Sequence, residues 1–221
     1  MKVVVFGASG MLGQGVVREC LLAADVSRVV CVGRRPSGAK DAKLEDVVHP
    51  DLLDLTAIEP RLAGYDACFY CLGVTSAGTS EADYRKVTLD YTVSVARTLS
   101  RLNPQMTFVF VSGQGTDETG KSRAMWARVK GEAENAVRGM PFRASFIFRP
   151  GFIQPLHGIQ SRTRLYRVLY VVLAPLVPVL KALSPGAVTT TEKVGRAMLR
   201  VARSGYPKAV LGNPDINEAA G

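Results

Sequence analysis

The sequence predicts an α/β protein in which a doubly wound parallel sheet carries helices on both faces. Apolar runs of strand length alternate with longer segments of helical period along most of the chain. The runs at residues 3–6 and 108–111 are apolar throughout, as strands covered on both faces are. A glycine-rich turn follows the first run directly. We therefore expect one domain over residues 1–221, with a core of residues 1–150 and a small C-terminal lobe of residues 151–221.

The predicted elements begin with a strand, a helix and a second strand, at residues 3–6, 11–24 and 29–32. The later strand candidates are residues 46–48, 67–71, 107–111, 145–148 and 209–211. Helical patterns lie among them at residues 82–102, 123–138 and 192–202. Because parallel strands need long crossovers, which are usually helical, this alternation indicates a parallel sheet.

The C-terminal lobe has a different composition. It carries an apolar stretch at residues 165–183, which Pro175 and Pro178 interrupt and in which Arg167 and Lys181 add charge. Prolines near the middle and charges near the ends disfavour a membrane-spanning helix. We expect a helical pair that packs on the core or lies at a surface, and we keep contact with a membrane surface as the less favoured alternative. We interpret the lobe as the substrate side of the molecule.

The charge balance suits a nucleic acid, an anionic membrane surface or an anionic small ligand. The chain has 28 basic and 19 acidic residues, which gives a net charge of +9. The basic residues are spread over the chain without a zinc-finger spacing or an RNP-like aromatic motif, so we expect no nucleic-acid partner. The first residues run straight into the glycines without the apolar segment of a secretory signal, and we therefore expect a cytoplasmic protein.

The four cysteines predict neither disulfides nor a metal site. Cys20, Cys31, Cys68 and Cys71 lie in apolar segments, which suits buried thiols in a reducing compartment. Cys68 and Cys71 have the spacing Cys-x-x-Cys, but strand alternation places them on opposite faces. Because no second pair accompanies them, we expect no metal.

The glycine-rich turn predicts a Rossmann-type dinucleotide site. Gly7 can take the tight turn, Gly10 lets the backbone approach a pyrophosphate, and Gly13 permits close packing of helix on strand. The amides at the start of the following helix face the phosphates. We expect the whole turn to contact the cofactor: Gly7, Ser9, Gly10, Met11, Leu12 and Gly13.

The end of the second strand favours NADP(H) over NAD(H). Sites for NAD place a carboxylate there for the ribose 2′-hydroxyl, whereas sites for NADP place arginine there for the 2′-phosphate. This strand ends in Gly33, Arg34 and Arg35, and the nearest following acid is Asp41. We therefore predict that Arg34 and Arg35 bind the phosphate, against the alternative that both are merely solvated.

With its turn spaced Gly-x-x-Gly-x-x-Gly, the chain resembles the short-chain dehydrogenase/reductase superfamily, in its atypical, epimerase-like and NmrA-like, NAD(P)-binding members. The stretch from His49 to Asp54 is similar to the family's Gly-Asp-Leu motif, with proline in place of the glycine. The resemblance implies that Asp51 and Leu52 contact the adenine, with Asp54 as the alternative to Asp51. It also implies further cofactor contacts from Cys71, Leu72, Gly73, Pro150, Gly151 and Phe152.

The resemblance implies a catalytic set of Ser, Tyr and Lys, of which this sequence keeps two. Ser112 follows the fifth strand, and Lys130 has the position of the family's lysine, which also holds the nicotinamide ribose. Trp126 stands where the family has tyrosine, and an indole is a donor that cannot exchange a proton near neutral pH. Ser112, Lys130 or a bound water would have to replace it in part, and His157 is a further candidate acid.

Two functions stay open on this sequence. The first is an NADP(H)-dependent oxidoreductase or epimerase-like enzyme acting on a small carbonyl substrate, and we favour it slightly. The second is a dinucleotide-binding sensor that has lost its catalytic tyrosine and whose C-terminal lobe a partner reads. The superfamily commonly pairs its subunits, so the resemblance also implies a homodimer.

Overall fold

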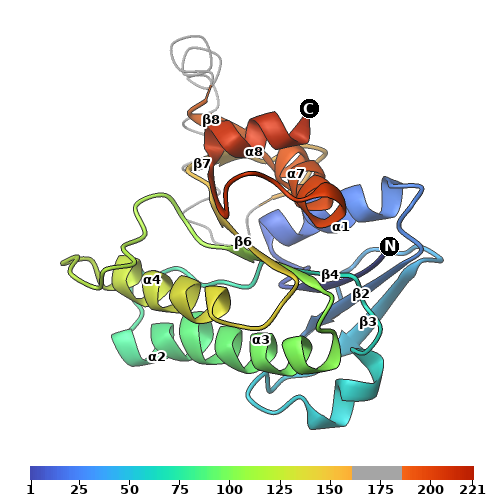
Figure 1. Cartoon of the computed structure of the whole chain (residues 1–221), viewed down its shortest axis with the longest axis horizontal. Coiled ribbons are helices and arrows are strands. Elements are labelled where there is room, and N and C mark those ends of the chain that lie inside the picture. Colours follow the sequence, from blue (N-terminus) through green and yellow to red (C-terminus); the bar gives the residue numbers. More distant parts are fainter. Residues whose placement is uncertain (161–185) are drawn as a thin grey trace.

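The structure is a computed structural model that describes residues 1–160 and 186–221. Its main sheet has seven parallel strands in the order β3-β2-β1-β4-β5-β6-β9 (Figure 1). This arrangement confirms the predicted fold class. The strands are β1 (Lys2–Phe6), β2 (Arg28–Gly33), β3 (Leu44–Val48), β4 (Ala67–Tyr70), β5 (Thr107–Val111), β6 (Ala144–Arg149) and β9 (Val210–Gly212).

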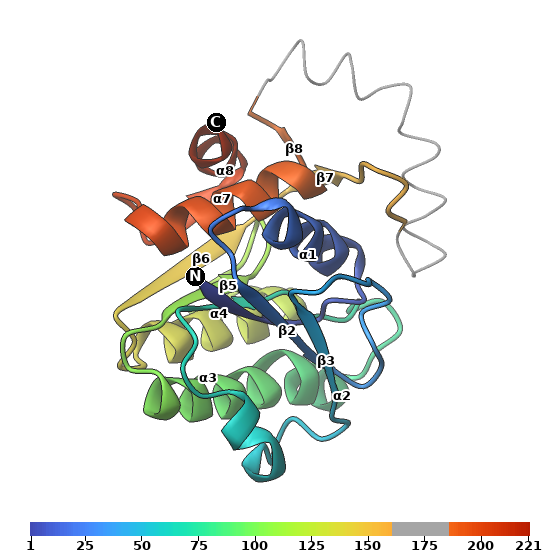
Figure 2. The ribbon, with the colours of Figure 1, turned by 90° about the vertical axis from the view of Figure 1, so that its right-hand side faces the viewer.

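Helices cover both faces of the sheet, as Figure 2 shows. One layer holds α1 (Met11–Leu22), α7 (Thr191–Ser204) and α8 (Asn213–Ala220), and the other holds α2 (Glu81–Arg85), α3 (Tyr91–Leu102) and α4 (Met125–Arg138). The side chains of β1 alternate between the layers. Val3 and Val5 join the cluster under α1 and α7, while Val4 and Phe6 join the cluster under α3 and α4. Burial on both faces explains why this strand is apolar throughout.

The predicted helix over residues 82–102 is interrupted. It consists of α2, a π-helical turn η2 (Lys86–Asp90) and α3 in direct succession. The Thr92 hydroxyl donates a hydrogen bond of 2.7 Å to the carbonyl oxygen of Thr88 within this region. A threonine side chain that competes for a helical carbonyl favours a local change of helical winding, which the apolar periodicity does not reveal.

Two crossovers depart from the simple alternation of strand and helix. Residues 34–43 join β2 to β3 without a helix, and a short 3-10 helix η1 (Thr56–Arg61) lies between β3 and β4. The pieces of chain that follow these strands are therefore loops, and both lie at the carboxyl edge of the sheet where ligands of such folds bind.

Much of the predicted C-terminal lobe belongs to the core. The strand β9 completes the main sheet beside β6, and α7 packs on α1. A two-stranded sheet that the sequence analysis missed, β7 (Phe152–Gln154) with β8 (Val188–Thr190), leads into α7. The predicted helical pair at residues 165–183 lies outside the described residues. Among the described residues, no helix is long and apolar enough to cross a membrane.

All four cysteines are free thiols. Cys68 packs into the cluster under α3 and α4, and Cys71 packs against the opposite cluster, on the two faces that alternation predicts. Within the described part of the chain, no three His, Cys, Asp or Glu side chains gather in a way that could hold a metal ion.

Candidate dinucleotide-binding site

The glycine-rich turn closes tightly between β1 and α1. Gly7 has a φ of +78°, and a β-carbon on it would lie 2.6 Å from the backbone nitrogen of Leu72. A β-carbon on Gly13 would lie 2.1 Å from the carbonyl oxygen of Gly7. Side chains are therefore excluded at both positions, for conformation at Gly7 and for packing at Gly13. The turn thus packs directly against Cys71 and Leu72, the residues that follow β4.

The start of α1 is free to bind an anion. Its N-cap residue Gly10 offers no side-chain hydrogen bond, and the first turn contains no acidic residue. Helix N-terminal amides and the helix dipole favour negative charge there. Gln14 steadies the turn, because its Nε2 donates a hydrogen bond of 3.2 Å to the carbonyl oxygen of Ser9. The predicted contacts Met11 and Leu12 lie in this first turn and are half-buried.

A cavity of about 280 Å³ opens beside the turn. The sequence-predicted residues Gly7, Ser9, Arg34, Arg35, Leu52, Leu72 and Gly73 line it. Asp51 and Cys71 are not among its lining residues. The glycine-rich turn, the two arginines and the apolar residues after β3 and β4 thus meet at one cavity, although they lie far apart in the sequence.

Arg34 and Arg35 stand at this cavity as exposed side chains. Neither forms an ion pair with any acidic residue that the structure describes. Two unpaired guanidinium groups beside an apolar cavity can recognise a phosphate through charge-assisted, bidentate hydrogen bonds.

The apolar wall of the cavity comes from two loops and from the helical segment formed by η2 and α3. Pro50 and Leu52 contribute from the loop after β3, and Val74 from the loop after β4. Val87 and Tyr91 complete the wall, and sequence reasoning missed both. Their spacing of four residues in a helical pattern was the available signal, because it places them on one face.

The two predicted carboxylates shape the loop after β3. The Asp51 carboxylate accepts a hydrogen bond of 2.9 Å from the backbone nitrogen of Leu53. The Asp54 carboxylate accepts one of 2.9 Å from the backbone nitrogen of Thr56, and the Thr56 hydroxyl lowers the pKa of Asp54. His49 bonds the carbonyl oxygen of Asp54 through Nε2 at 2.7 Å. These contacts hold Leu52 against the cavity.

The structure brings Ser112 and Lys130 together at the end of β5. Lys130, on α4, donates a hydrogen bond of 3.4 Å from Nζ to the carbonyl oxygen of Val111, the residue before Ser112. The same ammonium lies 5.7 Å from the centre of the Phe110 ring. Burial lowers the pKa of Lys130 to about 8, against the opposing effect of Glu134 one helical turn further on.

The proton of the Ser112 hydroxyl is used in a hydrogen bond within the protein. Ser112 is buried, and its Oγ lies 2.9 Å from Oγ1 of Thr116. Thr116 donates its own proton to the carbonyl oxygen of Gly113 at 2.8 Å. Because a threonine hydroxyl has one proton, Ser112 is the donor of the bond to Thr116. Ser112 therefore presents lone pairs, rather than a free proton, to any group beside it.

Trp126 occupies the same neighbourhood from the first turn of α4. A β-carbon on Gly115 would lie 3.3 Å from its indole ring, so the ring packs against the loop after Ser112. A tyrosine hydroxyl is thus replaced by an apolar ring system with one N–H donor.

The turn after β6 joins this neighbourhood. The carbonyl oxygen of Pro150 accepts a hydrogen bond of 3.0 Å from the backbone nitrogen of Gln114. The backbone nitrogen of Gly151 donates one of 3.0 Å to Oδ1 of Asn213, whose Nδ2 donates to the carbonyl oxygens of Phe152 and Ala187. The buried Asn213 side chain therefore fixes the predicted Pro150–Phe152 contacts next to the Ser112 loop.

His157 faces another part of the molecule. Its Nε2 lies 2.5 Å from Oε2 of Glu192 at the start of α7. Its ring is thus engaged with α7, and the interactions of the described residues do not connect it with Ser112 or Lys130.

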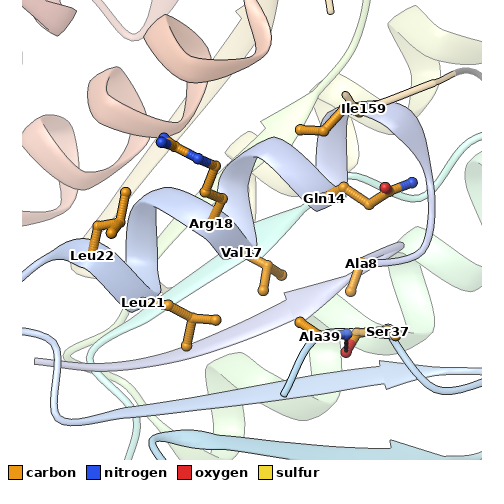
Figure 3. A pocket seen from close by; sticks show the side chains of 10 residues that line it. Ala8, Gln14, Val17, Arg18, Leu21, Leu22, Ser37, Ala39 and Ile159 are labelled. Carbon is orange, nitrogen blue, oxygen red and sulfur yellow. Dashed lines mark hydrogen bonds between the residues drawn. The ribbon is translucent and has the colours of Figure 1, made fainter. Parts of the chain in front are cut away.

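A second cavity, of about 500 Å³, runs along α1 (Figure 3). Val17 and Leu21 of α1 face Ser37 and Ala39 of the β2–β3 crossover across it, and Ala8 lines both this cavity and the first.

Fold and site together define a dinucleotide-binding Rossmann protein with an epimerase-like core. The chain belongs to the NAD dependent epimerase/dehydratase family, whose model matches residues 3–126. This membership confirms the resemblance found in the sequence.

Among curated proteins, the chain is similar to protein HTATIP2 of Rattus norvegicus and to the mitochondrial protein fmp52 of Emericella nidulans. It is 29% identical to HTATIP2 over 155 residues, which cover 69% of this chain and 62% of HTATIP2. It is 29% identical to fmp52 over 159 residues, which cover 69% of this chain and 66% of fmp52. The matches thus span a little less than two thirds of these relatives.

Solved structures share the fold at low identity. The WbmF enzyme of Bordetella bronchiseptica in complex with NAD+ has a TM-score of 0.68 at 16% identity, over 99% of this chain and 76% of that one. An oxidoreductase of the short-chain dehydrogenase/reductase family from Burkholderia thailandensis has a TM-score of 0.69 at 17% identity, over 99% and 92%.

Proposed function

We propose that this protein binds NADP(H) in preference to NAD(H) and uses it as an oxidoreductase or epimerase-like enzyme on a small carbonyl substrate. The observation that carries the proposal is the pair of exposed side chains Arg34 and Arg35 at the cavity of the glycine turn, which form no ion pair with any residue that the structure describes. A 2′-phosphate satisfies both guanidinium groups, whereas the 2′-hydroxyl of NAD lacks the carboxylate acceptor that it normally meets at this position.

The rest of the dinucleotide follows from this placement. The uncapped N-terminus of α1, where backbone amides favour negative charge, would hold the pyrophosphate. The apolar wall that includes Leu52 and Val87 would hold the adenine. Lys130 and the turn at Gly151 would hold the nicotinamide end, with Lys130 at its ribose hydroxyls.

Lys130 is the proton donor of the proposed reaction. The bound nicotinamide supplies or accepts the hydride. Ser112 uses its proton in the hydrogen bond to Thr116, so it can only accept a hydrogen bond from the substrate, and Trp126 cannot exchange a proton. A pKa of about 8 leaves the Lys130 ammonium mostly protonated at neutral pH and acidic enough to act in general acid catalysis. Carbonyl reduction should therefore slow as the pH rises through about 8.

The second candidate function is a dinucleotide-binding sensor without turnover, and the observation that favours it is Trp126 packed at the position of the tyrosine. Nicotinamide fluorescence separates the two when the NADPH complex meets a panel of aldehydes and ketones. Oxidation of NADPH that depends on one of these compounds supports the enzyme. Tight binding without oxidation by any of them would favour the sensor, and the absence of binding would sink both.

We further propose a cytoplasmic location, a small-molecule substrate, no nucleic-acid partner and a homodimer, with membrane contact as the less favoured alternative. The names of the fungal relatives place those proteins in mitochondria, so cell fractionation is the direct test of location. Light scattering of the purified chain tests the dimer, and a monomer mass would exclude it.

A further inference from the structure

Arg34 and Arg35 sit on a short arch of chain that is tied down at both ends. At one end, the carbonyl oxygen of Gly33 accepts a hydrogen bond of 2.9 Å from the backbone nitrogen of His49. At the other end, Ser37 donates two hydrogen bonds to Asp46 of β3. Its backbone nitrogen lies 2.8 Å from Oδ1 and its hydroxyl lies 3.2 Å from Oδ2.

Only three residues separate the two ends of the arch, which are Arg34, Arg35 and Pro36. Proline fixes its own φ and restricts the residue before it, so the arch has little freedom left once its ends are held. The ties at both ends lead to β3 and the residue that follows it, since Asp46 belongs to β3 and His49 comes directly after it. Asp46 itself is held in register, because it pairs with Cys31 of β2.

The remaining part of the crossover is fastened as well. The backbone nitrogen of Ala39 donates a hydrogen bond of 3.3 Å to the Ser37 hydroxyl. The Lys43 ammonium donates to the carbonyl oxygens of Leu21 and Ala23 at the end of α1, at 3.1 and 3.0 Å. Figure 3 shows Ser37 and Ala39 below α1. A loop without a helix is thus anchored firmly enough to hold two long cationic side chains at the cavity.

We propose that Asp46 is a positioning residue that sets the preference for NADP(H), because it ties down the arch that presents Arg34 and Arg35 to the 2′-phosphate. This inference rests on the proposed cofactor preference. When mobile arginines bind a ligand, they and their backbone lose conformational entropy, which weakens binding. In a fixed arch most of this ordering is already present before the ligand binds, so less entropy is lost. NAD(H) makes no such contact, so its affinity does not depend on Asp46.

The charge of Asp46 acts in the opposite direction. A carboxylate near the arginines repels a phosphate dianion, so its removal would by itself tighten NADPH binding. Positioning and charge therefore predict opposite signs for Asp46→Ala. Asp46→Asn separates the two effects, because the amide keeps an acceptor for the Ser37 nitrogen and a partner for its hydroxyl while the charge is lost.

The experiment compares the Kd of NADPH and of NADH by calorimetry for the full-length protein and its variants. We expect Asp46→Ala to reduce the ratio of NADPH to NADH affinity roughly 3- to 30-fold and to leave the NADH Kd within about twofold. Asp46→Asn should keep the wild-type ratio or raise it. Asp41→Asn is the matched control, because Asp41 lies on the same crossover and its carboxylate accepts a hydrogen bond from the nearby backbone nitrogen of Lys43. Ser37→Ala, which loses the hydroxyl contact alone, should show a smaller loss than Asp46→Ala.

A triple variant, in which Asp46, Arg34 and Arg35 are all alanine, tests whether Asp46 acts through the arginines. If Asp46 acts through the arginines, Asp46→Ala should change nothing further once Arg34 and Arg35 are both alanine. The inference would be overturned by an unchanged ratio of NADPH to NADH affinity in Asp46→Ala, or by tighter NADPH binding in both Asp46 variants. In either case the proposed function would stand as long as the wild-type protein prefers NADPH. A wild-type protein that prefers NADH would overturn both.

Discussion

At the residue scale, the guanidinium groups of Arg34 and Arg35 are tested by removal. Each change to alanine should raise the NADPH Kd roughly tenfold or more, because a charge-assisted hydrogen bond to phosphate is lost. The NADH Kd should stay nearly the same. Calorimetric titration of both variants at one ionic strength measures this, and an equal loss for the two cofactors would rule out the 2′-phosphate as the target of these residues.

Lys130 should reduce the stability of the fold that it serves. Its pKa of about 8 in the folded protein lies below the ordinary value of 10.5, so unfolding takes up a proton between these two pH values. The cost of burying the charge is therefore fully present below pH 8 and fades as the pH rises toward 10.5. We expect Lys130→Met to raise the free energy of unfolding at pH 7, and to raise it less at pH 9.5. Urea denaturation at the two pH values checks this, with exposed Lys86→Met as the control. A variant that is less stable at both would contradict the account.

Trp126→Tyr asks whether the missing acid limits the reaction. A tyrosine hydroxyl one turn before Lys130 would supply general acid catalysis, whose usual contribution is roughly 100- to 10,000-fold in rate. We expect faster oxidation of NADPH by reactive aldehydes in this variant, with an unchanged NADPH Kd. Trp126→Phe is the matched control without the hydroxyl. The same slow rate in both variants would mean that the rest of the site does not support carbonyl reduction.

The sequence predicted these residues unevenly. The glycines and arginines were found because their roles depend on local backbone and charge, which a sequence shows directly. Leu52 was placed by resemblance, while Val87 and Tyr91 were missed because their helical spacing places them on one face without showing that this face lines the cavity. The committed proton of Ser112 was likewise invisible, since it depends on the geometry of Thr116.

At the element scale, the contact between α1 and α7 holds the cofactor-side helix in place. A β-carbon on Gly15 would lie 2.7 Å from Cβ of Thr191 and 2.8 Å from its carbonyl oxygen. Gly15→Ala should therefore lower the free energy of unfolding by about 1–3 kcal/mol, because the overpacking exceeds the small gain in helix propensity. Gly139→Ala is the control, since its β-carbon would come no closer than 3.6 Å to any group. Equal urea midpoints for the two variants would show that the contact is loose.

The elements themselves were predicted where periodicity and burial agree. The strands of the main sheet and the helices α1, α4 and α7 were expected to within a few residues. The pair β7 and β8 was missed because three-residue strands leave no periodic signal, and η2 was missed because a change of winding keeps the helical pattern. The crossover at residues 34–43 stays in place through specific hydrogen bonds, which no pattern of apolar residues reveals.

At the scale of the whole molecule, the positive charge that is free to attract a ligand differs from the net charge. Many basic side chains are engaged in ion pairs between elements, such as Arg85 with Glu132 and Arg203 with Asp25. Arg34 and Arg35 stay unpaired at the cavity, so an anionic ligand meets them without competition from a described carboxylate. The net charge of +9 is therefore compatible with a phosphate ligand and requires no nucleic acid.

The most direct test of this account is a calorimetric titration of the wild-type protein with NADPH and with NADH at one ionic strength. We predict that NADPH binds at a single site with a Kd at least about tenfold lower than that of NADH. Added salt should weaken NADPH binding more than NADH binding, because the extra phosphate meets exposed arginines. Equal or tighter binding of NADH, or no binding of either dinucleotide, would contradict the central claim.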